Sequence, residues 1–129
     1  MDLSKQAIGR AGEFQAAAIF ERHGVVTTHV DIHGVDLWCE TPSGRRVSVQ
    51  VKAAQRPQPN YGNHVTPRYH FNVRPKDAHP ADVYCFVALD LSLLRLVSAG
   101  ELPPAATKKM GQNMFTETDM ATDIKRYLY

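Results

Sequence analysis

The feature that most restricts the fold of this chain is an alternating segment at positions 46–52, in which valine occupies every second position. Successive side chains of a β-strand point to opposite faces of its sheet. The three valines would therefore face a core, while Ser48, Gln50 and Lys52 would face the other side. The pattern predicts a strand that is covered on at least one face.

A second strand is predicted just before this one, because the preceding segment is rich in β-forming residues and ends in a Thr-Pro-Ser-Gly turn sequence. If residues 41–45 form the loop, Glu40 pairs with Arg46, and Asp36 then lies opposite Gln50. A shift of one residue would move Asp36 to the other face. The register therefore decides whether this carboxylate and this amide share a side of the sheet.

The remaining pattern is that of one α/β domain spanning residues 1–129. A first helix is expected between the N-cap Ser4 and the terminating Gly24, and a last helix after the N-cap Thr116. Residues 53–68 contain several prolines and are expected to form a long loop. The other expected strands are 25–30, 35–40, 69–73, 83–89 and 93–97. We therefore expect a mixed central β-sheet flanked by an N-terminal and a C-terminal helix.

Three small residues, Gly9, Gly12 and Ala16, recur at helical spacing in the first helix. Each interior glycine costs roughly 1 kcal/mol of helix stability, so a packing or functional reason is expected. Close packing of the helix on a sheet accounts for the pattern better than a phosphate-binding loop, because no glycine-rich turn follows a strand here.

Asp36 is the most informative residue chemically, because it is flanked by Val35 and Leu37. A carboxylate among apolar neighbours is costly unless it is paired or bound to a cation. Mg²⁺ is held in proteins by one or two carboxylates and further oxygen ligands, and Gln50 would supply such an oxygen. A nearby lysine can orient water and stabilise charge on a phosphate. Asp36, Gln50 and Lys52 together therefore suit hydrolysis of a phosphodiester.

Three short motifs in chain order carry a family resemblance. They are Gly12-Glu13 on the first helix, Gly34-Val35-Asp36 on a strand and Gln50-Val51-Lys52 on the next strand. This set resembles the PD-(D/E)XK nuclease superfamily, in particular its small members such as group I intron-associated endonucleases and Holliday junction resolvases. The resemblance implies a restriction-endonuclease-like core.

The resemblance also implies roles for individual residues. Asp36 would be the principal ligand of Mg²⁺ or Mn²⁺, and Lys52 would be the catalytic lysine. Glu13 would complete the site from the helix, and the carbonyl of Val51 would be a further ligand. Gln50 stands where the family usually has an acid, so the sequence offers a Gln-x-Lys variant that keeps the oxygen and lacks its charge.

Positive charge is concentrated in the middle of the chain. The formal net charge of the whole chain is +2, but residues 41–80 contain seven Lys or Arg and one Asp, a net +6. The remainder holds eight basic and twelve acidic residues, a net −4. Such a block, interleaved with Tyr61, Tyr69 and Phe71, is typical of a segment that holds a phosphate backbone. The residues expected to bind nucleic acid are Arg45, Arg46, Arg56, Arg68, Arg74 and Lys76.

Other classes of protein are disfavoured. No apolar run approaches the roughly 20 residues of a membrane helix, and the first ten residues lack the apolar stretch of a signal peptide, so we expect a cytoplasmic protein without a membrane partner. The two cysteines, Cys39 and Cys85, are far apart in strand-like segments. We expect them to be buried free thiols rather than zinc ligands.

The sequence therefore predicts a metal-dependent DNA endonuclease. One domain carries one site, so cleavage of both strands favours a homodimer or a higher homo-oligomer. The first alternative is a catalytically inactive nuclease-like module that binds nucleic acid or a protein partner, which Gln50 favours. The second alternative is an unrelated α/β interaction protein, in which Asp36 and Lys52 would lie apart.

Overall fold

The computed structural model describes residues 2–32, 34–59, 66–73, 81–102 and 107–129. Within these residues the chain forms two α-helices, two short 3₁₀ helices and seven strands. The helices are α1 (Lys5–Arg22), η1 (Ala99–Glu101), η2 (Gln112–Met114) and α2 (Glu117–Leu128). The strands are β1 (Val26–Ile32), β2 (Val35–Glu40), β3 (Arg46–Ala54), β4 (Arg68–Asn72), β5 (Val83–Ala88), β6 (Leu93–Ser98) and β7 (Thr107–Gly111).

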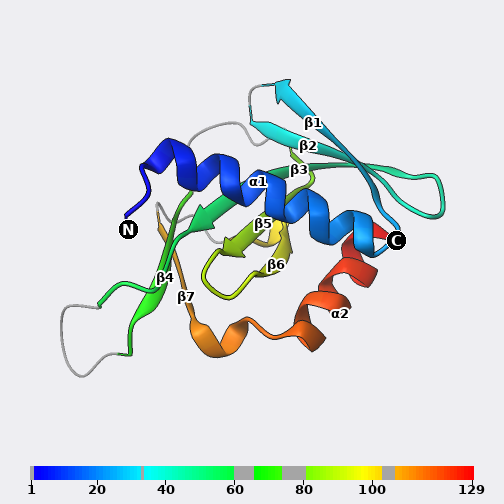
Figure 1. The fold of residues 1–129 in the computed structure, drawn as a ribbon. Helices are drawn as coiled ribbons and strands as arrows, with labels where there is room; N and C mark the ends of the chain where they lie inside the picture. The colour runs from blue at the N-terminus through cyan, green and yellow to red at the C-terminus, as the bar shows by residue number, and fades with distance from the viewer. Residues whose placement is uncertain (1, 33, 60–65, 74–80, 103–106) are drawn as a thin grey trace.

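The central sheet has five strands in the order β1-β2-β3-β5-β6 (Figure 1). β3 and β5 are parallel, and the other neighbours are antiparallel, so the predicted mixed sheet is confirmed. α1 crosses one face of this sheet, and α2 packs beside β6 (Figure 1). The fold class predicted from the sequence is therefore the one observed, with a helix at each end of the chain.

The structure differs from the prediction in three places. The strand predicted at 69–73 is present as β4, but it lies outside the central sheet and pairs with β7 in a separate two-stranded ribbon. β7 itself was not predicted. The long loop expected at 53–68 is also shorter, because β3 continues to Ala54 and Gln58 forms an isolated bridge with Arg68; residues 60–65 lie outside the described part of the chain.

The α-helices begin at the caps that the sequence predicts. Ser4 Oγ accepts the N–H of Ala7 at 3.1 Å, and Thr116 Oγ1 accepts the N–H of Asp119 at 3.0 Å. Gly24 follows α1 with a φ of +83°, a conformation that glycine adopts at little cost. None of the described helices combines the length and apolar character of a membrane span.

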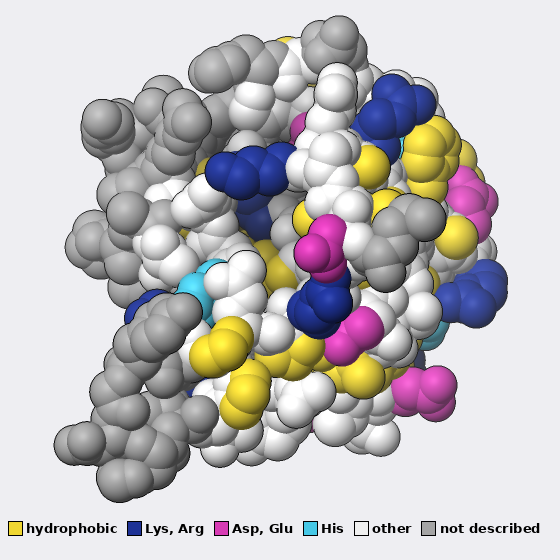
Figure 2. Space-filling view, turned by 60° about the vertical axis from the view of Figure 1, so that its left-hand side comes forward, with side chains coloured by type: hydrophobic (Ala, Val, Ile, Leu, Met, Phe, Trp, Pro, Cys, Tyr) yellow, Lys and Arg dark blue, Asp and Glu magenta, His cyan; other side chains and the backbone are white. Residues whose placement is uncertain are grey.

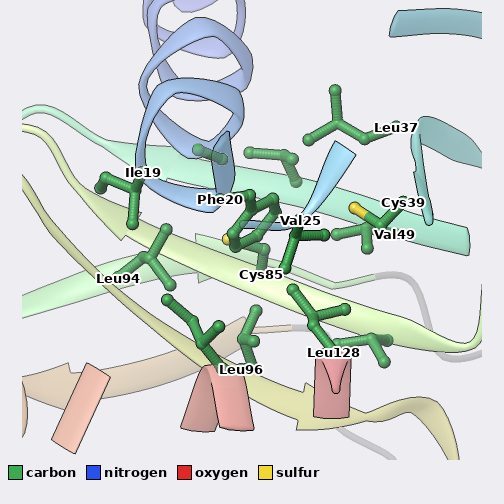
Figure 3. Close-up of a cluster of buried hydrophobic side chains, with 14 of the residues drawn as sticks. Ile19, Phe20, Val25, Leu37, Cys39, Val49, Cys85, Leu94, Leu96 and Leu128 are labelled. Carbon is green, nitrogen blue, oxygen red and sulfur yellow. The ribbon is translucent and has the colours of Figure 1, made fainter. Parts of the chain in front are cut away.

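Two hydrophobic clusters lie on opposite faces of the central sheet. The larger lies between the sheet, α1 and α2, and includes the three valines of the alternating segment. Figure 3 shows Ile19 and Phe20 of α1 directed toward Val25, Cys85 and Leu94, with Leu128 of α2 on the other side of the same cluster. The smaller cluster joins β5 to the β4–β7 ribbon. The sheet is thus covered on both faces along β5.

Gly12 allows α1 to lie directly on β3. A Cβ built on Gly12 would lie 2.5 Å from the Cβ of Ala53 and 3.5 Å from Cγ1 of Val51. A contact of 2.5 Å between carbon atoms is too short, so a larger residue would push the helix from the sheet. The close packing predicted for the small residues of α1 is confirmed at this position, whereas a Cβ on Gly9 would meet nothing within 4 Å.

Candidate active site

The β2–β3 hairpin has the register that the turn sequence predicts. Glu40 lies opposite Arg46, and the ladder continues to Leu37 opposite Val49, where the regular pairing ends. Asp36 is the next residue of β2. Continuing the register by one residue brings it level with Gln50.

The Asp36 carboxylate occupies the point at which β2 and β3 stop pairing, which we call the β2–β3 fork. Its Oδ2 accepts the backbone N–H of Val51 at 2.7 Å. In an antiparallel ladder a backbone carbonyl would normally accept this bond. Because the N–H and C=O of one residue point to the same neighbouring strand, the Val51 carbonyl also faces the fork.

The three polar residues of the fork share one side of the sheet. Leu37 and Val49 belong to the cluster beneath α1, and alternation along each strand directs Asp36, Gln50 and Lys52 away from it. All three are half-buried. This arrangement does not agree with the alternative in which Asp36 and Lys52 lie apart.

Glu13 approaches the same end of β3 from α1. It is half-buried and directly follows Gly12, which lies against Val51 and Ala53. The contact of Gly12 with β3 therefore places the backbone of α1 at Glu13 near this end of the strand.

The donors at the fork are of one chemical kind. They are the carboxylate of Asp36, the amide oxygen of Gln50 and the carbonyl of Val51; the carboxylate of Glu13 is predicted to join them from α1. No group of three or more His, Cys, Asp or Glu placed to hold a metal is found among the described residues. Oxygen donors with only one or two carboxylates fit Mg²⁺ or Mn²⁺, which prefer hard oxygen ligands and retain water molecules. They do not fit a soft metal.

The cysteine thiols provide no nucleophile. Cys39 and Cys85 are free and buried, as the sequence predicts. Burial raises the pKa of the Cys39 thiol to about 11, and burial also raises the pKa of Cys85 well above its ordinary value. Both thiols therefore remain protonated near neutral pH and are unreactive.

The arginines predicted to bind nucleic acid lie in different surroundings. The Arg45 guanidinium donates to the carbonyls of Tyr127 at 3.4 Å and Tyr129 at 3.0 Å, which anchors the C-terminal end of α2. Arg46 lies over the ring of Trp38, with its guanidinium carbon 5.3 Å from the ring centroid.

The other predicted contacts are spread over the chain. Arg56 forms an ion pair with Asp2, and Arg68 is exposed at the start of β4. Arg74 and Lys76 lie outside the described residues.

The aromatic residues assigned to the basic block are not at the surface. Tyr69 and Phe71 are 0% and 1% exposed, because both belong to the smaller hydrophobic cluster. The expectation that they interleave with cations on a nucleic-acid-binding surface is wrong for these two. Tyr61 lies outside the described residues.

A groove that the sequence did not reveal opens beside Lys52. This β3-end groove has a volume of about 870 Å³ and runs between the first turns of α1, the end of β3 and the β4–β7 ribbon. Lys5, Arg56 and His70 line it together with Lys52. The sequence does not indicate that Lys5 and His70 lie near Lys52, because the three residues are far apart in the chain. The one local signal is that His70 is a polar residue between two apolar residues, Tyr69 and Phe71. Figure 2 shows Lys and Arg side chains around a hollow in this face.

Comparison with solved structures shows a structural relationship. No family model and no curated protein matches the chain. A solved structure described as that of a bacterial homing endonuclease, I-Ssp6803I, matches with a TM-score of 0.67. The match covers 84% of this chain and 76% of that chain at 16% sequence identity. The two proteins therefore share a fold, which for this chain is a nuclease-like fold.

Proposed function

We propose that the protein is a metal-dependent DNA endonuclease that hydrolyses phosphodiester bonds. The observation that carries the proposal is the Asp36–Val51 hydrogen bond at the β2–β3 fork, with Gln50 and Lys52 on the same side of the sheet. The fold shared with a bacterial homing endonuclease supports it. In this proposal the Gln-x-Lys segment is a variant of the PD-(D/E)XK motif.

Each residue of the fork has a role in the proposed mechanism. Asp36 and Glu13 would hold Mg²⁺ or Mn²⁺ with help from Gln50 and the Val51 carbonyl. The bound ion would stabilise negative charge on the phosphate. Lys52 would orient a water molecule in line with the scissile bond. The water oxygen then bonds to phosphorus while the bond to the leaving ester oxygen breaks, and the proton of the water passes to solvent.

The substrate is expected to be DNA, held through its backbone. The concentration of positive charge in residues 41–80 supports this partner. We propose one site in each chain, so that a homodimer or a higher homo-oligomer would cleave both strands.

The second candidate is a catalytically inactive module that binds DNA. Gln50 favours it, because an uncharged oxygen in place of a carboxylate lowers the affinity for a divalent cation.

A nicking assay separates the two functions. Supercoiled, linear and branched DNA would be incubated with Mg²⁺ or Mn²⁺ and wild-type protein, Asp36→Ala or Lys52→Ala. Lys125→Ala, at an exposed position of α2, serves as the control for loss of a lysine. We expect cleavage by the wild type and the control only. Equal cleavage by all four proteins would contradict the catalytic roles, and salt-sensitive binding without cleavage would support the inactive module.

A further inference from the structure

The β3-end groove has the chemical character of a channel for a charged chain. Three cations line it, Lys5, Lys52 and Arg56, and one carboxylate, Asp2. Asn72, Thr107 and two glutamines add uncharged hydrogen-bonding groups. No Phe, Tyr or Trp is among the described residues that line it. Aliphatic residues such as Leu3 and Ile8 line the rest of the groove. Cations and polar groups without aromatic side chains suit a phosphate backbone better than stacked bases.

One residue that lines the groove, His70, has a side-chain nitrogen in an unusual environment. The Nε2 of His70 is buried and has no hydrogen-bond partner among the described residues. Buried nitrogen atoms of this kind nearly always have a partner in native proteins.

Gly9 forms part of the same wall. A Cβ built on it meets nothing within 4 Å, so the packing of α1 on the sheet does not require a glycine there. Glycine nevertheless destabilises a helix interior relative to alanine. Gly9 leaves the helix backbone uncovered on its open side, so another molecule can approach it closely there.

We infer that the β3-end groove holds the sugar–phosphate backbone of one DNA strand, which passes across Gly9 and between Lys5 and Arg56. The inference rests on the proposed function and names the part of the substrate that lies next to Lys52. The groove contacts phosphates and leaves the bases unread, so it contributes affinity that is independent of base sequence.

The test measures binding without cleavage. The affinity of a labelled DNA duplex is measured by fluorescence anisotropy over a range of salt concentrations in buffer without divalent metal. Lys5→Gln should lower the slope of log affinity against log salt by about 0.9, the value for loss of one phosphate contact. Asp2→Asn should strengthen binding, because it removes the one carboxylate in the lining. Lys125→Gln, an equal loss of charge on α2, should leave the slope unchanged.

Gly9→Ala separates a role of Gly9 in DNA binding from a purely structural role, because the two roles predict opposite effects of alanine. The substitution should raise the melting temperature by roughly 3 °C, because alanine favours the helix. It should nevertheless weaken DNA binding by about tenfold, the scale of one or two lost contacts. Thr122→Ala, an exposed helix position in α2, should raise the melting temperature without affecting binding.

The results also separate this inference from the proposed function. Normal binding by Lys5→Gln, Asp2→Asn and Gly9→Ala would overturn the channel, even if Lys52→Ala abolishes cleavage. Weakened binding by Lys5→Gln and Gly9→Ala would support the channel, even if the wild-type protein cleaves no DNA with any metal.

Discussion

The carboxylate of Asp36 takes the hydrogen bond that would otherwise join Val51 to β2, with 2.7 Å between Oδ2 and the backbone nitrogen. This bond gives Asp36 a structural role in addition to its proposed catalytic role. It fixes the carboxylate in the β2–β3 fork and satisfies a backbone donor where the ladder ends. The two roles can be separated by substitution.

Asp36→Asn and Asp36→Ala should differ in stability but not in activity. Asparagine retains an oxygen that can accept the Val51 N–H, so we expect a change in the free energy of unfolding of less than about 1 kcal/mol. Alanine leaves that donor without a partner and should cost about 1–3 kcal/mol. Both should lose cleavage, because neither supplies a charged metal ligand. Urea unfolding and the nicking assay check the pair; cleavage by Asp36→Asn would show that the charge is not required.

Gln50→Glu should increase the apparent affinity for the metal. The substitution adds a negative charge level with Asp36, in a half-buried position where charges interact more strongly than in water. We expect the Mg²⁺ concentration for half-maximal cleavage to fall by roughly tenfold.

The control for this experiment is Gln112→Glu, which makes the same change at an exposed position in η2. If both variants need as much Mg²⁺ as the wild type, Gln50 does not lie in the coordination sphere.

The contact between Gly12 and Ala53 is expected to tolerate little change. Gly12→Ala introduces a Cβ 2.5 Å from the Cβ of Ala53, so we expect destabilisation of about 1–3 kcal/mol despite the better helix propensity of alanine. Ala53→Gly in the same chain removes the opposing carbon and should restore part of the loss. A double-mutant cycle in urea measures this coupling. Additive effects of the two substitutions would mean that the two atoms do not meet.

The sequence predicted local and neighbouring relationships well. The turn after Glu40 and the alternating valines determined the β2–β3 register, since both depend on adjacent residues. β7 was not predicted because Met110 is the only buried residue of a strand that is otherwise polar. Its pairing with β4 depends on contacts between segments about 40 residues apart, which leave no periodic pattern in either segment.

The candidate site could likewise be predicted only where it depends on residues close together in the sequence. The positions of Asp36, Gln50 and Lys52 followed from one hairpin, whereas the engagement of Arg45 depends on the distant C-terminus. Tyr69 was assigned to the surface because its basic neighbours are in a segment rich in proline. It is buried because the β4–β7 ribbon covers β5, a tertiary contact that the local composition does not indicate.

The stability of the protein should fall between about pH 9 and pH 11 through Cys39. The pKa of this thiol is raised from 9.0 to about 11 in the folded chain, because burial disfavours the thiolate. Below pH 9 the thiol is protonated in both states, so its contribution is fully present. Between pH 9 and pH 11 the unfolded chain ionises first, which favours unfolding, and the contribution is lost as the pH passes the folded pKa. Cys39→Ala removes this dependence, although its smaller side chain lowers stability at every pH. Urea unfolding of both proteins at pH 8 and pH 10.5 should show a larger fall for the wild type, by about 2 kcal/mol; parallel falls would contradict the assignment to Cys39.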